Sequence, residues 1–201
     1  MSPFHRFRTA AAKATNRFRS NQRGSTVVEF ALVAPLFFAL LFAIIETGLM
    51  FFASQSLETA LQDSARTIMT GQAQIAKYDK QSFKQNVVCP NVSALFDCAN
   101  GIFVDVQSYP SGFAGVTISD PITAGNFVDN TQYNPGGPGD IVVVRLFYQW
   151  PLFVTGLGYN IANLSGSKRL LSATVAFKNE PYSSGYEVDV QHLGFGGGVE
   201  E

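Results

Sequence analysis

The chain has 201 residues, of which 46% are hydrophobic and only 14% are charged, against about 25% charged residues in ordinary soluble domains. The net charge of −1 hides an asymmetry: residues 1–24 contain six Lys or Arg and no acid, whereas residues 25–201 carry a net charge of −7. A basic head, an apolar run and an acidic body favour an oriented membrane protein, and the apolar run that follows at once argues against a free basic tail that binds nucleic acid.

The apolar run is long enough to cross a membrane. Residues 27–45 contain one strongly polar side chain, that of Glu29, and apolar residues resume after Glu46 and Thr47 as far as Ala53. A helix of nineteen residues is about 28 Å long, close to the hydrocarbon thickness of roughly 30 Å. Glu29 and Glu46 are seventeen positions apart, so they can bracket the hydrocarbon near its two faces. The basic leader places the N-terminal side in the cytoplasm and the body across the membrane.

A cleavable secretory signal is the alternative to a retained anchor. Such a signal has an apolar core of roughly 7–15 residues and ends in a small-residue cleavage site. The run in this chain is longer, and no A-x-A pattern closes it. We therefore predict a retained transmembrane helix over residues 25–53.

The start of the run carries a motif. Basic residues precede Gly24 and Ser25, and Glu29 and Phe30 follow within the apolar helix. This arrangement resembles the processing site of type IV pilins, where a prepilin peptidase cuts after the Gly. The resemblance implies cleavage between Gly24 and Ser25, with Glu29 one helical turn from the new amine. The alternative is that Glu29 only reaches the cytoplasmic headgroups.

A wider stretch, RGSTVVEFALVAPLFFALLFAIIETG at residues 23–48, resembles the N-terminal signature of TadE-like proteins. These are minor pseudopilins of the tight-adherence (Flp, type IVb) pilus system. Residues 175–182, VAFKNEPY, are similar to a short basic-Asn-Glu-Pro motif near the C-termini of that family. The resemblance implies helix packing in the membrane and partners that include prepilin peptidase, other pilins or pseudopilins and assembly-platform proteins. Residues 27–52 lack a G-x-x-x-G motif, which fits general bundle contacts better than a tight dimer. The candidate packing residues are Val33, Leu36, Phe37, Leu40 and Ile44.

The helix is expected to continue beyond the membrane. Leu57, Ala60, Leu61, Ala65 and Ile68 recur at helical spacing, and Gly71 is a plausible stop. Residues 54–71 therefore read as an amphipathic extension that packs on the C-terminal domain. Together with the membrane half, the extension predicts the lollipop shape of a pilin.

Residues 72–201 are predicted to form an α+β domain on the periplasmic side of a bacterial inner membrane. Three strands are expected at 102–109, 141–150 and 170–177, separated by turn-rich segments, and they predict a small antiparallel sheet packed on the long helix. Residues 194–198 are Gly-rich and read as a flexible tail. Cys89 and Cys98 are expected to form a disulfide, because a redox pair lacks the C-x-x-C spacing and two cysteines with a distant His192 do not make a zinc site.

No catalytic, cofactor or metal motif is visible in the sequence, so we do not expect an enzyme. The favoured function is that of a membrane-anchored pseudopilin-like protein in Flp pilus assembly, processed after Gly24. The alternative is an uncleaved signal-anchor protein whose periplasmic domain docks assembly partners or a ligand. A periplasmic enzyme on an anchor is the third reading, and no motif supports it.

Overall fold

A computed structural model describes residues 23–92, 95–155 and 159–182. Most of the basic leader and the Gly-rich tail therefore lie outside the described residues. The elements, in chain order, are helices α2 (Arg23–Met69), α3 (Gln72–Ile75) and α4 (Lys80–Phe83), the π-helical turn η1 (Lys84–Val88), helices α5 (Cys89–Asn91) and α6 (Cys98–Gly101), strand β1 (Ile102–Tyr109), the 3₁₀ turn η2 (Phe113–Gly115), and strands β2 (Ile122–Thr123), β3 (Asn126–Phe127), β4 (Ile141–Pro151) and β5 (Lys168–Lys178).

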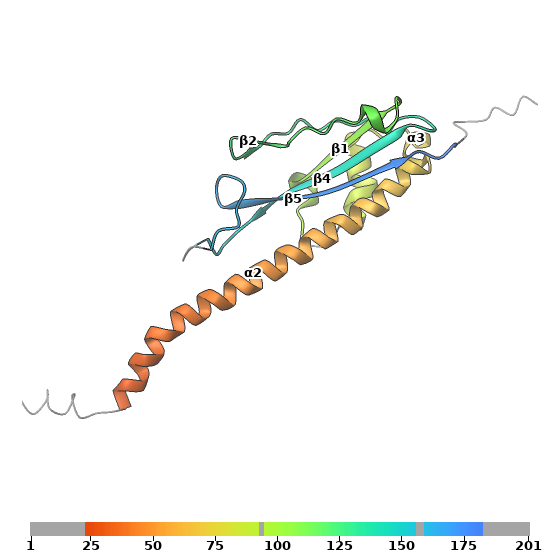
Figure 1. Cartoon of the computed structure of the whole chain (residues 1–201). Coiled ribbons are helices and arrows are strands. Elements are labelled where there is room, and N and C mark those ends of the chain that lie inside the picture. The colour runs from red at the N-terminus through yellow and green to blue at the C-terminus, as the bar shows by residue number, and fades with distance from the viewer. Residues whose placement is uncertain (1–22, 93–94, 156–158, 183–201) are drawn as a thin grey trace, which may run out of the picture.

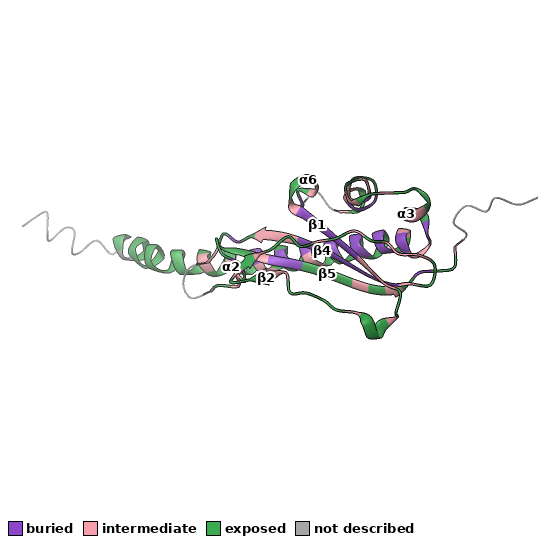
Figure 2. Cartoon of the chain, turned by 90° about the horizontal axis from the view of Figure 1, so that it is seen from above, coloured by how far each residue is buried: buried purple, intermediate pink, exposed green. Residues whose placement is uncertain are grey.

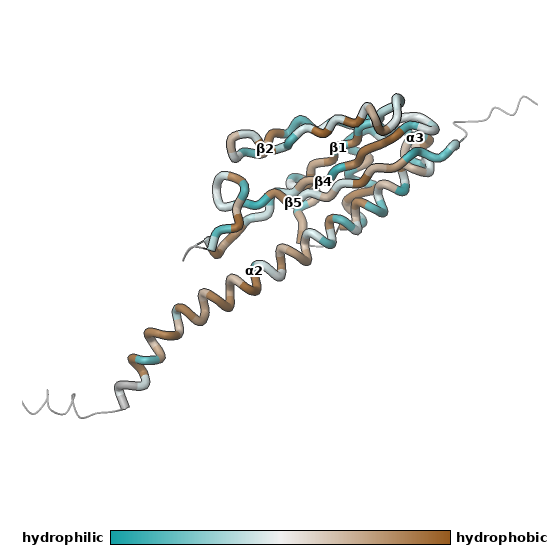
Figure 3. The backbone as a smooth tube through the Cα atoms, viewed as in Figure 1, coloured by the Kyte–Doolittle hydropathy of each residue, from teal (hydrophilic) through white to brown (hydrophobic). Residues whose placement is uncertain are grey.

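One helix of 47 residues, α2, runs the length of the molecule and has two different halves. Its N-terminal half projects beyond the body as a bare rod, and its C-terminal half lies along the sheet (Figure 1). The projecting half is exposed and strongly hydrophobic, whereas the other half is buried along one side (Figures 2 and 3). The helix continues through Pro35 without interruption. A rod of apolar side chains that is left largely uncovered by the described residues matches a membrane anchor.

The body is a three-stranded antiparallel sheet in the order β1-β4-β5. β4 lies in the centre, pairing Ile102 to Tyr109 of β1 with Tyr148 to Ile141, and its other edge pairs with the whole of β5. A long helix packed on a small antiparallel sheet confirms the predicted α+β class. The three predicted strands are present: β1 has the expected bounds, β4 is one residue longer, and β5 begins two residues earlier and ends one later.

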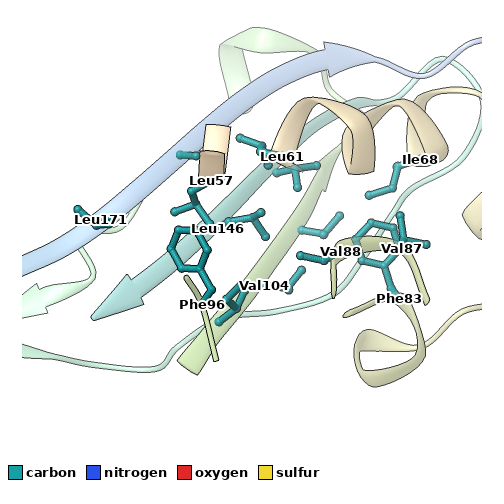
Figure 4. Close-up of a cluster of buried hydrophobic side chains, with 14 of the residues drawn as sticks. Leu57, Leu61, Ile68, Phe83, Val87, Val88, Phe96, Val104, Leu146 and Leu171 are labelled. Atoms are coloured by element: carbon teal, nitrogen blue, oxygen red, sulfur yellow. The ribbon is translucent and has the colours of Figure 1, made fainter. Parts of the chain in front are cut away.

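The main core lies between α2 and one face of this sheet (Figure 4). Leu57, Leu61 and Ile68 of α2 are at most 1% exposed and belong to the same buried cluster as Val104 of β1 and Leu146 of β4. The amphipathic reading of this half of the helix is therefore correct. Burying each of these large side chains stabilises the fold by about 1.5–3 kcal/mol, which is why the helix stays attached to the sheet.

The opposite face of the sheet is covered by the connection between β1 and β4. Phe127 of the β2–β3 hairpin packs on Phe103 and Phe147, with ring centroids 4.6 and 5.8 Å away. Alternation along β1 places Phe103 and Asp105 on this face and Val104 on the helix face. β4 is therefore buried on both faces over most of its length, whereas Ser172, Thr174 and Ala176 of β5 are exposed.

A run of short helical turns between α2 and β1 closes the edge of the core. Phe83 and Val88 from this run are fully buried. Cys89 and Cys98 are joined in a disulfide with their Cα atoms 5.6 Å apart, in agreement with the pair expected from the sequence. The disulfide links the start of α5 to the start of α6. Between them lies Phe96, whose ring packs edge-on against that of Tyr148 at 4.9 Å.

Candidate functional site

The predicted processing segment occupies the first turns of α2. Gly24, Glu29 and Phe30 are exposed, and a Cβ built on Gly24 would meet no atom within 4 Å. Ser25 and Glu29 are four positions apart in one continuous helix, so they lie one turn apart on the same side. Among residues 23–92, 95–155 and 159–182, none covers this end of the helix. Cleavage between Gly24 and Ser25 stays a prediction.

The predicted helix-packing residues are all exposed, with exposed fractions between 57% for Phe37 and 68% for Leu36. Their pattern, i, i+3, i+4, i+7 and i+11, keeps them on one side of a helix. Leu36, Leu40 and Ile44 border a groove against the body, and the groove is described below. Exposed apolar side chains of this kind need lipid or other helices around them. Which of the two covers them stays a prediction.

Glu46 attaches the anchor to the body. Its side chain is only 7% exposed. The carboxylate accepts hydrogen bonds from the backbone N–H groups of Phe153 and Val154, the latter at 3.1 and 3.2 Å to its two oxygens. Phe153 and Val154 belong to residues 152–155, the segment after β4 that we call the proximal loop. Next to Glu46, the Thr47 hydroxyl contacts that of Tyr159. We call these contacts the Glu46 clamp.

The sequence analysis placed Glu46 near the far face of the hydrocarbon and did not predict this contact. Its partners are main-chain N–H groups, which every non-proline residue carries. The only local signal was the polar pair Glu46-Thr47 in the middle of an apolar helix. A separate signal elsewhere in the chain is the apolar run Leu152 to Val154, which follows the β4 strand pattern directly.

The other end of α2 is held by the C-terminal motif. The backbone N–H of Glu180 donates to the carbonyl of Met69, the last residue of the helix, at 2.9 Å. Asn179 is buried, and its side-chain Nδ2 donates to the carbonyls of Pro135 and Gly137, both at 3.0 Å. The basic-Asn-Glu-Pro motif therefore ties the end of the helix to residues 134–140, which we call the Gly-Pro turn.

Tyr182 completes this distal contact. Its hydroxyl donates to the carbonyl of Gly136 at 3.2 Å, and its ring lies so close to Gly71 that a Cβ there would be 2.2 Å from the ring. Gly71 has φ of 78°, a left-handed value that ends the helix. Burial, with a smaller contribution from the charge of Asp140, raises the pKa of the Tyr182 hydroxyl above its ordinary value.

The buried charged groups of the sheet form a structural pair. The Arg145 guanidinium binds the Asp105 carboxylate with Nη2–Oδ2 and Nε–Oδ2 distances of 2.7 and 2.9 Å, and both side chains are at most 5% exposed. Asp105 also accepts from the side chain of Gln107 and the backbone of Gln132, and Arg145 lies over the ring of Phe147. Each charge is thus neutralised and hydrogen-bonded, as buried charges require.

Within the described ranges, no group of three or more His, Cys, Asp or Glu side chains could hold a metal ion. The features that stand out concern how the long helix is exposed and how it is attached to the body. They are an exposed apolar anchor, a clamp at the point where the anchor meets the body, and a second attachment at the far end of the same helix.

Comparison with known proteins finds a family match within α2. Residues 24–66 match the family model described as TadE-like protein, which confirms the resemblance read from this segment. The match covers the anchor and most of its amphipathic extension. No curated protein and no solved structure matches the chain. The matched family comprises pilus components rather than enzymes. The match and the exposed apolar helix together fit a single-pass, membrane-anchored protein related to tight-adherence pili.

Proposed function

We propose that this chain is a pseudopilin-like protein that takes part in Flp (type IVb) pilus assembly and is processed after Gly24 by a prepilin peptidase. The observation that carries the proposal is the coincidence of the TadE-like match, residues 24–66, with a helix whose first half projects beyond the body and is mostly exposed. A bare apolar helix on a folded head is suited to lateral packing with other such helices in a membrane.

The proposed orientation puts the N-terminal leader in the cytoplasm and the sheet domain in the periplasm. The six basic residues of 1–24 support this arrangement through the positive-inside rule. The partners that follow are the lipid bilayer, the prepilin peptidase, other pilins or pseudopilins and the assembly platform. In this reading Glu29 pairs with the new amine of Ser25, its own or that of a neighbouring subunit, and sets the register of packed helices.

The intact mass and the N-terminal sequence of the protein recovered from membranes test the processing step. A start at Ser25 is expected. A start at Met1 or Ser2 would contradict the proposal and favour the uncleaved signal-anchor protein that docks partners through its periplasmic domain.

A glycine pair supplies the matched control for this measurement. Gly24 and Gly48 both lie in α2, and a Cβ at either would meet no atom within 4 Å. Gly24→Val is therefore expected to block cleavage without disturbing the fold, whereas Gly48→Val leaves cleavage intact. Equal cleavage of both variants would remove Gly24 from the recognition site.

The role of Glu29 is tested separately in cells that assemble the pilus. Glu29→Ala is expected to insert in the membrane at the wild-type level and to fail in assembly. Glu58→Ala is the control, because Glu58 is exposed on the same helix outside the apolar half. Normal piliation of the Glu29 variant would contradict the proposed register role.

A further inference from the structure

We propose that the proximal loop, residues 152–155, is a second membrane contact. It rests in the lipid leaflet from which α2 emerges and, together with the anchor, fixes the height and tilt of the domain. The proposal depends on membrane anchoring by α2. It does not depend on cleavage at Gly24 or on pilus assembly, so either proposal can fail without the other.

The position of the loop along the helix is the first argument. From Thr26 to Glu46 the helix rises by about 30 Å at 1.5 Å per residue, which equals the hydrocarbon thickness of a typical bilayer. The loop meets the helix at Glu46, through the N–H groups of Phe153 and Val154. A span that starts at Thr26 therefore brings the loop to the boundary between hydrocarbon and headgroups.

The composition of the loop is the second argument. Residues 146–167 contain no charged side chain. Phe153, at its tip, is 86% exposed, the largest exposed fraction among the large hydrophobic side chains of the described residues. Trp150 and Tyr159 flank the loop, and Trp and Tyr are the residues enriched where a membrane meets water. An exposed Phe between two amphipathic aromatics matches an interfacial segment.

The space beside the loop is the third argument. A groove of about 740 Å³ separates the loop from α2 and is lined mainly by apolar side chains, including Leu36, Leu40, Ile44, Phe51 and Phe153. A second groove of about 380 Å³ lies beside Glu46, between Phe42, Leu49 and Trp150. Both grooves continue the surface of the anchor that already faces lipid. Acyl chains can fill them, whereas water would leave their apolar walls hydrated at a free-energy cost.

Backbone hydrogen bonding is the fourth argument, because segments that touch lipid must satisfy their own polar groups. The N–H groups of Phe153 and Val154 donate to the Glu46 carboxylate, and that of Leu152 donates to the carbonyl of Ser167 at 2.9 Å. Three successive backbone donors of the proximal loop are thus paired within the protein. The Glu46 clamp is what makes the loop compatible with a low-dielectric surrounding.

Two basic residues at the start of β5 lie close to the loop. Lys168 is exposed and pairs with Pro151 at the base of the β4–β5 hairpin, and Arg169 follows it. Cations at this height are placed to meet anionic lipid headgroups. The occupant we assign to the grooves is therefore lipid, with the headgroup layer against Lys168.

Trp150 is the only tryptophan of the chain, so its fluorescence reports the position of the loop without labelling. The full chain is reconstituted at low density in phosphatidylcholine–phosphatidylglycerol vesicles that contain lipids brominated at a shallow or a deep acyl position. We expect a loss of Trp150 emission that is larger with the shallow bromines. Emission unaffected by bromines at either depth would overturn the proposal.

Two phenylalanines provide a matched pair of variants. Phe153 and Phe113 are both exposed, at 86% and 65%, and Phe113 lies in η2, after the distal end of β1. Phe153→Ser is expected to reduce the quenching by shallow bromines, and Phe113→Ser to leave it unchanged. Neither side chain belongs to the core, so both variants should fold. Equal quenching in all three proteins would overturn the role of the loop.

Varying the amount of protein per lipid distinguishes two occupants of the grooves, lipid and a second copy of the chain. If lipid fills the grooves, the quenching of Trp150 is already complete at low protein density and does not increase as protein per lipid rises. Quenching that is absent at low density, together with emission that changes only as protein per lipid rises, would assign the grooves to a second copy and overturn the proposal.

Discussion

The carboxylate of Glu46 accepts a hydrogen bond from the backbone N–H of Val154, 108 positions further along the chain. This contact joins the middle of the long helix to the end of the central strand. The C-terminal end of the helix is joined to the body by the hydrogen bond from Glu180 to Met69. The attached half of α2 is therefore held at both ends and packed against the sheet between them, and the projecting half continues from it in the same helix.

Substitution of Glu46 should loosen the membrane-proximal end of the domain. Glu46→Ala leaves the N–H groups of Phe153 and Val154 without an acceptor, at a cost of about 1–3 kcal/mol. Glu46→Gln keeps a neutral acceptor and should fall between the wild type and the alanine variant, since hydrogen bonds to charged groups are roughly twice as strong as neutral ones. Amide hydrogen exchange of the peptide that contains Phe153 and Val154 is the measurement, with Glu58→Ala as control. Unchanged exchange in Glu46→Ala would show that the clamp contributes nothing to order in the loop.

Gly71 should be far less tolerant of a side chain than a glycine with a similar positive φ in open space. Gly71→Ala combines a left-handed φ of 78° with a Cβ 2.2 Å from the ring of Tyr182. Gly166, with φ of 75°, has no atom within 4 Å of its Cβ position, so Gly166→Ala carries only the backbone strain of about 1–2 kcal/mol. Thermal unfolding in detergent compares the two variants. We expect the larger loss in Gly71→Ala, and Tyr182→Ala in the same chain should recover part of it.

The features of this fold that were predictable from sequence are those with a local signature. β4 is a run of β-branched and aromatic residues bounded by turns, and the buried side of α2 repeats at helical spacing through Leu57 and Leu61. The Glu46 clamp and the pairing of Asp105 with Arg145 join residues far apart in the chain, so no local pattern indicates them. The short helices between α2 and β1 are three to five residues long, too short for a periodic pattern.

Asp105 and Arg145 should stabilise the sheet only when both charges are present. Arg145→Met leaves the Asp105 carboxylate buried without its counter-charge, and we expect a loss of about 3–5 kcal/mol in the free energy of unfolding. The double variant Asp105→Leu with Arg145→Met removes both charges and should be less destabilised than the single variant. A double-mutant cycle measured by denaturant unfolding tests this order. A double variant no better than Arg145→Met would mean that packing, not charge, dominates at this site.

The cap at the start of α4 is expected to make a small contribution to folding stability that is lost in acid. The side chain of Ser82, and then its backbone N–H, donate hydrogen bonds to the Asp79 carboxylate and hold the pKa of that exposed group below its usual value. Because the folded pKa is depressed, the stabilisation is present above the unfolded pKa and is lost as the pH falls through the folded one. NMR titration of the Asp79 side chain measures the shift. Ser82→Ala should bring the pKa back toward its ordinary value, and an unchanged titration would contradict the capping assignment.

Loss of the disulfide should weaken the segment that closes the edge of the core. Cys89 and Cys98 are nine positions apart, and closing a loop of that length stabilises the folded state by about 3 kcal/mol in the chain-entropy model. The double variant Cys89→Ala with Cys98→Ala should lower the free energy of unfolding by roughly that amount. Unfolding of the wild type in reducing agent should reproduce the variant, and the variant itself should not respond to the reductant. Because Phe96 packs against Tyr148 within this region, the same loss should appear as faster amide exchange around Phe96. A wild type indifferent to reduction would show that Val88 and Phe83 hold the segment in place without the covalent link.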